Sequence, residues 1–151
     1  MDIESLLKLL NGHAVEYVII GAAAFPVHGY SRATLDLDIF IRPDEANARR
    51  VLEALRQFGY DVTDLTVQDL LESKILIRQY ELETDLHPFV KGVSFDEVWQ
   101  HRVSDTYGRT PAIFASLEDL IRMKRAANRA KDQEDLRVLL HLLQRRKSGE
   151  P

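Results

Sequence analysis

Two aspartates one residue apart carry the clearest chemical signal in this sequence. Asp36 and Asp38 lie in the run Thr34-Leu35-Asp36-Leu37-Asp38-Ile39, which otherwise has the composition of a β-strand. Aspartate is depleted in strands, so a pair here needs an explanation. Because strand side chains alternate between faces, both carboxylates project from one face, and the other face is formed by Leu35, Leu37, Ile39 and Ile41. Two adjacent carboxylates suit a hard divalent cation such as Mg²⁺.

The segment before the pair favours this interpretation over a half-solvated strand whose charges only face water. The aliphatic run Val15 to Ile20 predicts a strand that ends at Gly21, and residues 22–28 predict a short helix that Gly29 closes. Pro26 is compatible with the first turn of that helix. A glycine between a strand and a helix lets backbone N–H groups approach a phosphate. The alternative is an ordinary turn glycine.

These residues resemble the signature of the nucleotidyltransferase superfamily that includes DNA polymerase beta. The signature stands here as Ile20-Gly21-Ala22, a gap of thirteen residues and Asp36-Leu37-Asp38. The lead-in from His28 to Thr34 is similar to that of a small bacterial subgroup, which includes the abortive-infection (AbiEii-type) toxins of toxin–antitoxin pairs. The resemblance extends from about Tyr17 to Leu143. One departure is Ala22, where the superfamily usually has glycine or serine.

The resemblance implies an enzyme that transfers a nucleoside monophosphate from an NTP to a hydroxyl and releases pyrophosphate. Mg²⁺, with two ions in the complete scheme, would be held by three carboxylates that are also catalytic: Asp36, Asp38 and Asp85. Four further residues would bind the nucleotide: Gly21, Ala22, Arg32 and Lys124. The implied acceptor is an RNA, such as a tRNA 3′ end, or a protein, in a toxin–antitoxin setting with a cognate partner. The alternatives are a catalytically inactive nucleotide-binding antitoxin or regulatory module and a metal phosphohydrolase.

The third carboxylate and the lysine have structural alternatives. Strand alternation places Glu81, Glu83, Asp85 and His87 on one face, so the pattern alone does not single out Asp85, which also fits a charged edge strand. Lys124 falls on or beside the apolar stripe of a predicted helix. Its ammonium group either extends to water past the helix edge or, as the resemblance favours, binds triphosphate oxygens.

The order of elements predicts an α+β (mixed α/β) fold, in which helices flank a small mixed β-sheet and the C-terminal end is helical. Helices are expected at 2–10, 43–58, from Thr66, from Ser94, at 116–129 and from Asp132, which would cap the last helix and form a salt bridge. Strands are expected up to Ile20, around the aspartate pair, weakly at 60–62, at 75–82 and around Asp85, with at most a short one at 112–114.

Composition indicates one globular domain over residues 1–147 and a short disordered tail at 148–151. The 151 residues are 45% hydrophobic and 29% charged, with a net charge of −4 and no cysteine, which excludes disulfides and thiolate zinc sites. The basic residues 122–131 and 145–147 are local exceptions that could contact tRNA. No apolar run approaches the roughly 20 residues of a membrane span, and no signal peptide is recognised, so we expect no membrane partner and a cytoplasmic location.

Overall fold

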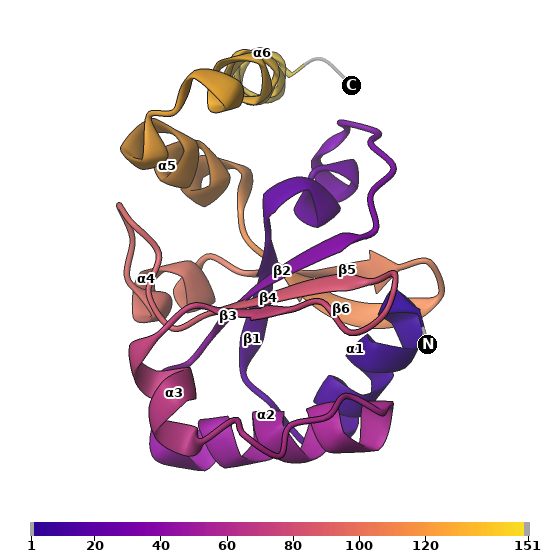
Figure 1. Ribbon diagram of the computed structural model, residues 1–151. Helices are drawn as coiled ribbons and strands as arrows, with labels where there is room; N and C mark the ends of the chain where they lie inside the picture. Colours follow the sequence, from indigo (N-terminus) through magenta and orange to yellow (C-terminus); the bar gives the residue numbers. More distant parts are fainter. Residues whose placement is uncertain (1, 150–151) are drawn as a thin grey trace.

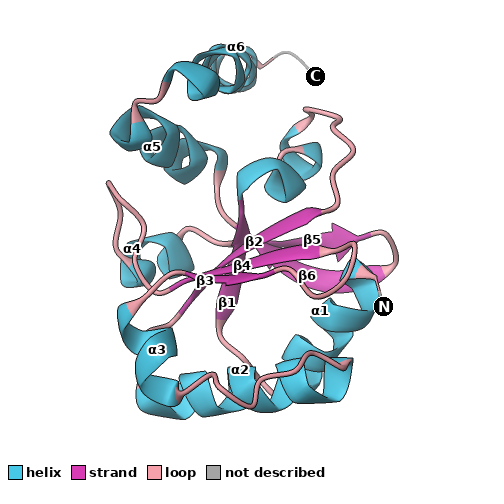
Figure 2. Ribbon diagram, in the orientation of Figure 1, coloured by secondary structure: helices cyan, strands magenta, loops and turns pink. Residues whose placement is uncertain are grey.

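A six-stranded mixed sheet forms the centre of the molecule (Figures 1 and 2), and the computed structural model describes residues 2–149. The strand order is β3-β4-β2-β1-β6-β5. The strands are β1 (Tyr17–Ile20), β2 (Asp36–Ile41), β3 (Ile75–Ile77), β4 (Glu83–His87), β5 (Val103–Tyr107) and β6 (Thr110–Phe114). The β2–β4 and β1–β6 pairs are parallel and the other pairs are antiparallel. This mixed sheet with helices around it confirms the predicted fold class.

Helices lie on both sides of the sheet. One side carries α1 (Ile3–Gly12), α2 (Glu45–Phe58) and α3 (Val67–Glu72) (Figures 1 and 2). The other carries the short 3₁₀ turns η1 (Gly21–Ala24) and η2 (Pro26–His28), then α5 (Leu117–Ala127), η3 (Ala130–Asp132) and α6 (Gln133–Lys147). The short α4 (Phe95–Gln100) packs on this second side, where the Phe95 ring meets Phe40 of β2 edge-on. No helix within residues 2–149 is long and apolar enough to cross a membrane.

Alternation along β2 places its apolar residues in the core beneath the sheet. Leu37, Ile39 and Ile41 are fully buried, as the pattern predicts. Leu35 was expected on the same face but is 64% exposed, because it precedes Asp36, the first residue of β2 that pairs with β4. The buried apolar face therefore begins at Leu37, two residues later than the sequence suggests.

Several local predictions are confirmed by side-chain caps. Ser116 caps α5 by accepting a hydrogen bond from the N–H of Asp119 at 3.1 Å. Thr66 and Ser94 begin α3 and α4 with reciprocal capping boxes. Pro26 occupies the first turn of η2, where its missing N–H costs no hydrogen bond.

Four other local predictions need correction. Residues 60–62 form no strand. They are an irregular segment whose Tyr60 and Val62 side chains are buried in the core. The strand expected at 75–82 ends at Ile77, and the chain bends after it. The short strand expected at 112–114 is longer and pairs with β5, whose largely exposed side chains gave no apolar pattern. Asp132 precedes α6 but makes no capping hydrogen bond; only its predicted salt bridges are present.

The tail predicted for residues 148–151 falls partly outside the structure. Ser148 and Gly149 form a turn after α6, and residues 150–151 lie outside the described residues.

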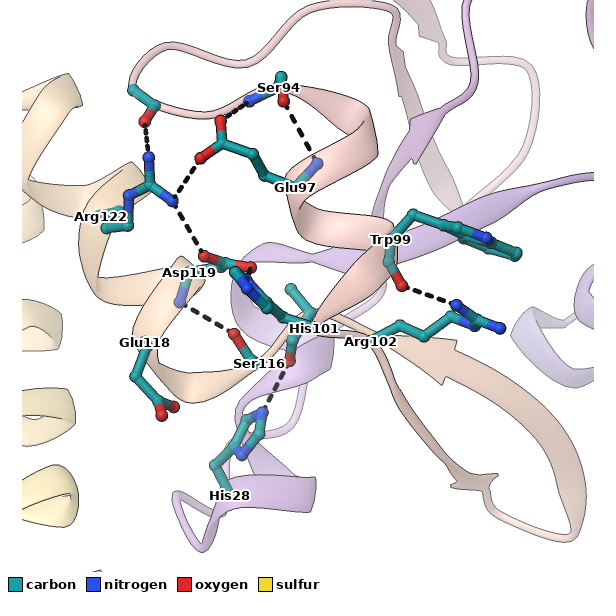
Figure 3. Close-up of polar contacts among 12 residues, drawn as sticks. His28, Ser94, Glu97, Trp99, His101, Arg102, Ser116, Glu118, Asp119 and Arg122 are labelled. Carbon is teal, nitrogen blue, oxygen red and sulfur yellow. Dashed lines mark hydrogen bonds and ion pairs between the residues drawn. The ribbon is translucent and has the colours of Figure 1, made fainter. Parts of the chain in front are cut away.

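A buried carboxylate ties α5 to α4 (Figure 3). The side chain of Asp119 is 1% exposed and accepts hydrogen bonds from His101 Nδ1 at 3.0 Å and Arg122 Nη1 at 3.4 Å. Arg122 also contacts Glu97 of α4 at 3.2 Å. In contrast, the Glu118 side chain points away from this cluster (Figure 3). Asp119 therefore fixes the start of α5 relative to the segment that follows β4.

Replacing this carboxylate should destabilise the fold. We expect Asp119→Ala to lower the free energy of unfolding by about 2 kcal/mol, since it removes two charged hydrogen bonds from a buried position. Urea denaturation at neutral pH measures this change. Glu118→Ala is the matched control, because that side chain is 62% exposed and its ion pair with Arg146 is long at 3.6 Å. Equal effects of the two substitutions would contradict this role of Asp119.

Candidate active site

The parallel pairing of β2 with β4 gathers carboxylates on one face of the sheet. Asp36 lies opposite Glu83, and Asp38 lies opposite Asp85. Because side chains two residues apart share a face, all four carboxylates project toward the side that carries η1 and α5. Three of them are the predicted catalytic residues, and the fourth, Glu83, was noted on the same strand face without a role. The structure therefore brings the three predicted carboxylates together.

His87 extends this row at the end of β4. Its Nε2 atom lies 2.8 Å from Oδ1 of Asp38, and the two side chains are 14% and 27% exposed. Asp38, Asp85 and His87 each offer one ligand atom, and these three atoms all lie within 4.8 Å of one another. Such a set could hold a metal ion, whereas Asp36 lies outside it.

Of the two histidines near the signature residues, only His87 lies beside the carboxylates. His28 is buried, and its Nε2 donates to the carbonyl oxygen of Ala115 at 2.8 Å. Burial lowers the pKa of His28, so the ring is neutral and its Nδ1 accepts from Arg146 at 3.2 Å. His28 thus links η2 to the end of β6, and it does not reach the carboxylates.

Mutual repulsion among the carboxylates is partly relieved by an arginine. The hydrogen bond and charge of Asp36 raise the pKa of Glu83, while Arg78 acts in the opposite direction. Arg78 Nη1 lies 2.8 Å from Oδ1 of Asp85, and its Nε lies 3.7 Å from Oε1 of Glu83. This guanidinium places one positive charge beside both Asp85 and Glu83. No sequence pattern singled out Arg78, because residues 75–82 were expected to form one continuous strand.

Gly21 lies directly against the Asp38 carboxylate. Its φ is +69°, and a Cβ atom added there would lie 2.9 Å from Oδ2 of Asp38. Both the left-handed backbone and the close contact therefore require glycine. Ala22 follows within η1, so the glycine element and the aspartate pair are adjacent. Phosphate binding by Gly21 and Ala22 stays a prediction.

Lys124 and Arg32 share the carboxylate of Asp135 and do not contact the aspartate pair. Lys124 Nζ lies 3.1 Å from Asp132 and 3.3 Å from Asp135, and Arg32 Nη1 lies 2.5 Å from the same Asp135. Both cations also lie over the ring of Phe25, at 5.7 and 5.8 Å. The lysine predicted to face inward thus has acidic partners on η3 and α6. A role of Lys124 and Arg32 toward a triphosphate stays a prediction.

A third cation joins this group from the loop after α5. Arg129 Nε lies 2.6 Å from Asp132, and the charge of Asp38 contributes to the raised pKa of Arg129. Three cations, Arg32, Lys124 and Arg129, therefore share the two carboxylates of Asp132 and Asp135. The sequence placed Arg129 only in a basic cluster that could contact RNA. Its position instead puts positive charge within electrostatic reach of Asp38.

The glycine position can be tested by adding a single methyl group. We expect Gly21→Ala to lower the free energy of unfolding by about 1–3 kcal/mol, because it combines left-handed strain with a steric contact against Asp38. Gly12→Ala at the end of α1 is the control, since a Cβ there meets nothing within 4 Å. It should be neutral or slightly stabilising. Chemical denaturation of both variants measures the difference, and a harmless Gly21→Ala would contradict the close approach.

The ion pairs of Asp132 predict a dependence of stability on pH. The hydrogen bond from Arg129, assisted by Lys124, lowers the pKa of Asp132 to about 2. Because the folded pKa is depressed, this stabilisation is complete above the unfolded value of about 4 and is lost as the pH falls toward 2. Asp132→Asn should therefore be less stable than the wild type at pH 6, and the difference should shrink between pH 4 and pH 2. A constant difference across urea titrations at these pH values would contradict the assignment.

Comparison with known proteins agrees with this geometry. Residues 1–142 match the model of a family described as nucleotidyltransferase of unknown function (DUF6036). No curated protein matches the sequence. The closer likeness to AbiEii-type toxins stays a prediction. Because the match spans nearly all of the 151 residues, the chain belongs to this family of nucleotidyltransferases.

Proposed function

We propose that this protein transfers a nucleoside monophosphate from an NTP to a hydroxyl group in an Mg²⁺-dependent reaction. The observation that carries the proposal is the β2–β4 register, which sets Asp38 opposite Asp85 with Asp36 two residues away on the same face. Gly21 adjoins Asp38, so a triphosphate cradled at the turn would lie next to these carboxylates.

The donor set fits a divalent cation. Asp36, Asp38 and Asp85 are oxygen donors, and they remain partly open on the side away from the sheet. These three residues would hold Mg²⁺. When bound, the ions supply charge neutralisation at the α-phosphate and make the acceptor hydroxyl more acidic. Asp36 raises the pKa of Glu83 through a hydrogen bond and through its charge, so negative charge is crowded at this site. Binding of a cation would relieve that crowding.

The chain's own groups would complete the reaction. The acceptor oxygen forms a bond to the α-phosphorus while the bond from that phosphorus to the pyrophosphate oxygen breaks. Asp85 would receive the hydroxyl proton, and pyrophosphate would leave along the phosphate contacts. Arg32 and Lys124 would neutralise those phosphates. Both cations now pair with Asp135, so the phosphates would have to share them with that carboxylate. The backbone amides of Gly21 and Ala22 would hold the triphosphate.

The resemblance to abortive-infection toxins suggests the acceptor and the setting. An RNA acceptor such as a tRNA 3′ end, or a protein hydroxyl, would be modified within a toxin–antitoxin pair. Arg32, Lys124 and Arg129 lie on this side of the sheet, where they would contact the phosphates of an RNA acceptor.

A second candidate is a nucleotide-binding module without transferase activity. Two observations favour it: Arg32 and Lys124 are already neutralised by acidic residues, and Ala22 replaces the usual glycine or serine. Such a module would act as an antitoxin or regulatory subunit. It would bind NTP tightly and release no pyrophosphate.

Transfer of labelled NTP tests the proposal. The protein is incubated with each labelled NTP, Mg²⁺ and either tRNA or a protein fraction, and the label on the acceptor and the released pyrophosphate are measured. We expect Asp36→Asn and Asp38→Asn each to lower transfer by about 100-fold or more, since each removes a metal ligand. Glu53→Gln is the control, because Glu53 lies on α2 beneath the sheet and pairs only locally with Arg56.

The outcomes separate the candidates. Equal inactivity of the wild type and both aspartate variants with all four NTPs and both acceptors would overturn the transferase proposal. NTP binding without pyrophosphate release would support the regulatory module. Release of both NMP and pyrophosphate with no modified acceptor would instead indicate a phosphohydrolase.

A further inference from the structure

The cation positions along β2 and β4 differ in their donor atoms. At one end, Asp36 lies opposite Glu83, so only carboxylate oxygens are present. At the other end, Asp38 and Asp85 are joined by the imidazole of His87, with all three ligand atoms within 4.8 Å. The same row of side chains therefore offers an oxygen-only position and a position that includes nitrogen.

We propose that Asp38, Asp85 and His87 form a binding site for a first-row transition-metal ion such as Mn²⁺, with His87 Nε2 as a direct ligand. This inference rests on the proposed function only in placing a cation at this site. It goes further by naming His87 as a ligand and by naming the class of ion that this position selects.

The backbone holds the three ligands in place. Asp38 and Asp85 are directly opposed in the parallel ladder, and His87 follows on the same face of β4. Ligands on paired strands are positioned more precisely than ligands on loops. Their side chains are 14–27% exposed, so the site is sheltered by the sheet and still open to water or substrate oxygens. This is the arrangement of a reactive site that keeps free coordination positions.

The chemistry of the donors favours a transition-metal ion at this end. Mg²⁺ prefers an all-oxygen shell and retains several waters. Imidazole suits first-row transition ions, and two carboxylates with one imidazole bring two negative charges to a divalent ion. The oxygen-only end near Asp36 remains suited to Mg²⁺ held together with a triphosphate. Two unlike ions could therefore occupy one active site.

Present contacts show what the ion would replace. His87 Nε2 donates to Oδ1 of Asp38 at 2.8 Å, and Arg78 Nη1 contacts Oδ1 of Asp85 at 2.8 Å. An ion would take the place of both donors: the ring would present the lone pair of Nε2 with its proton on Nδ1, and the guanidinium would leave Asp85. Arg78 can do so without disturbing the ladder, because it lies just beyond the end of β3.

The alternative is that His87 only positions Asp38 through this hydrogen bond. In that case the ring would not touch the ion. Direct ligation and positioning can be separated by spectroscopy, because only a coordinated nitrogen couples to the electron spin of Mn²⁺.

The experiment uses the full chain and Mn²⁺ as the probe. Titration followed by the electron paramagnetic resonance signal of free Mn²⁺ gives the affinity, and pulsed resonance on the bound ion detects nitrogen-14 modulation. We expect modulation in the wild type. His87→Gln should lose it and bind Mn²⁺ about tenfold or more weakly, while Mg²⁺ binding changes less. His141→Gln, which alters an exposed histidine on α6, should leave both measurements unchanged.

Additional variants keep the test decisive. Circular dichroism verifies that His87→Gln is folded, and His87→Ala removes the ring without leaving an amide. Arg78→Gln should strengthen Mn²⁺ binding, because it removes the cation that competes for Asp85. The proposal is overturned if the wild type binds no Mn²⁺, if bound Mn²⁺ shows no nitrogen modulation, or if the modulation persists in folded His87→Gln.

Failure of this inference is distinct from failure of the transferase proposal. Transfer of NMP with Mg²⁺ and no nitrogen modulation would remove His87 as a ligand and leave the transferase function intact. Nitrogen modulation without transfer in any metal would leave the site assignment standing and overturn the function.

Discussion

The parallel register between β2 and β4 is the constraint on which the site depends. It sets Asp38 against Asp85 and Asp36 against Glu83, so like charges face each other across one ladder. Opposed like charges are destabilising in a sheet, and here the buried apolar residues on the opposite face of the same strands hold them together. Leu37, Ile39 and Leu86 are fully buried on the opposite face. A shift of one residue would expose this core, so the hydrophobic face enforces the register that brings the carboxylates together.

The C-terminal helices depend on a second electrostatic arrangement. Asp119 anchors α5 to α4, and Asp135 draws together Lys124 and Arg32 over the Phe25 ring. These contacts fasten the helical end to the turn that follows Gly21. Asp135 pairs with the two cations, Arg32 and Lys124, that a triphosphate would need. The proposed phosphate binding would therefore compete with stability for one set of charges.

Local sequence signals predicted the parts of the structure that depend on neighbouring residues. Alternation in β2 and the caps at Ser94 and Ser116 each involve residues within a few positions of one another, so the sequence alone sufficed. The position of His87 depends instead on the register between β2 and β4, which brings it against Asp38, 49 positions away. The position of Arg78 depends on the bend after β3, which turns its side chain back toward Asp85. The partners of Lys124 required the packing of α6 on α5. A cap and a salt bridge were both predicted for Asp132, and only the salt bridges are present.

The difference between β3 and β4 explains how one site can be both rigid and able to take up a cation. Residues 83–87 continue in the ladder, so Asp85 and His87 cannot move without breaking strand pairing. Residues 78–82 leave the sheet after only three paired residues, so Arg78 is bound to the site by its side chain and not by strand hydrogen bonds. At the proposed metal site, a guanidinium on such a bend would neutralise Asp85 and would leave when an ion binds, while Asp85 and His87 stay in place. The early end of β3 is therefore a feature of the site, because a longer strand would have fixed Arg78 in the ladder.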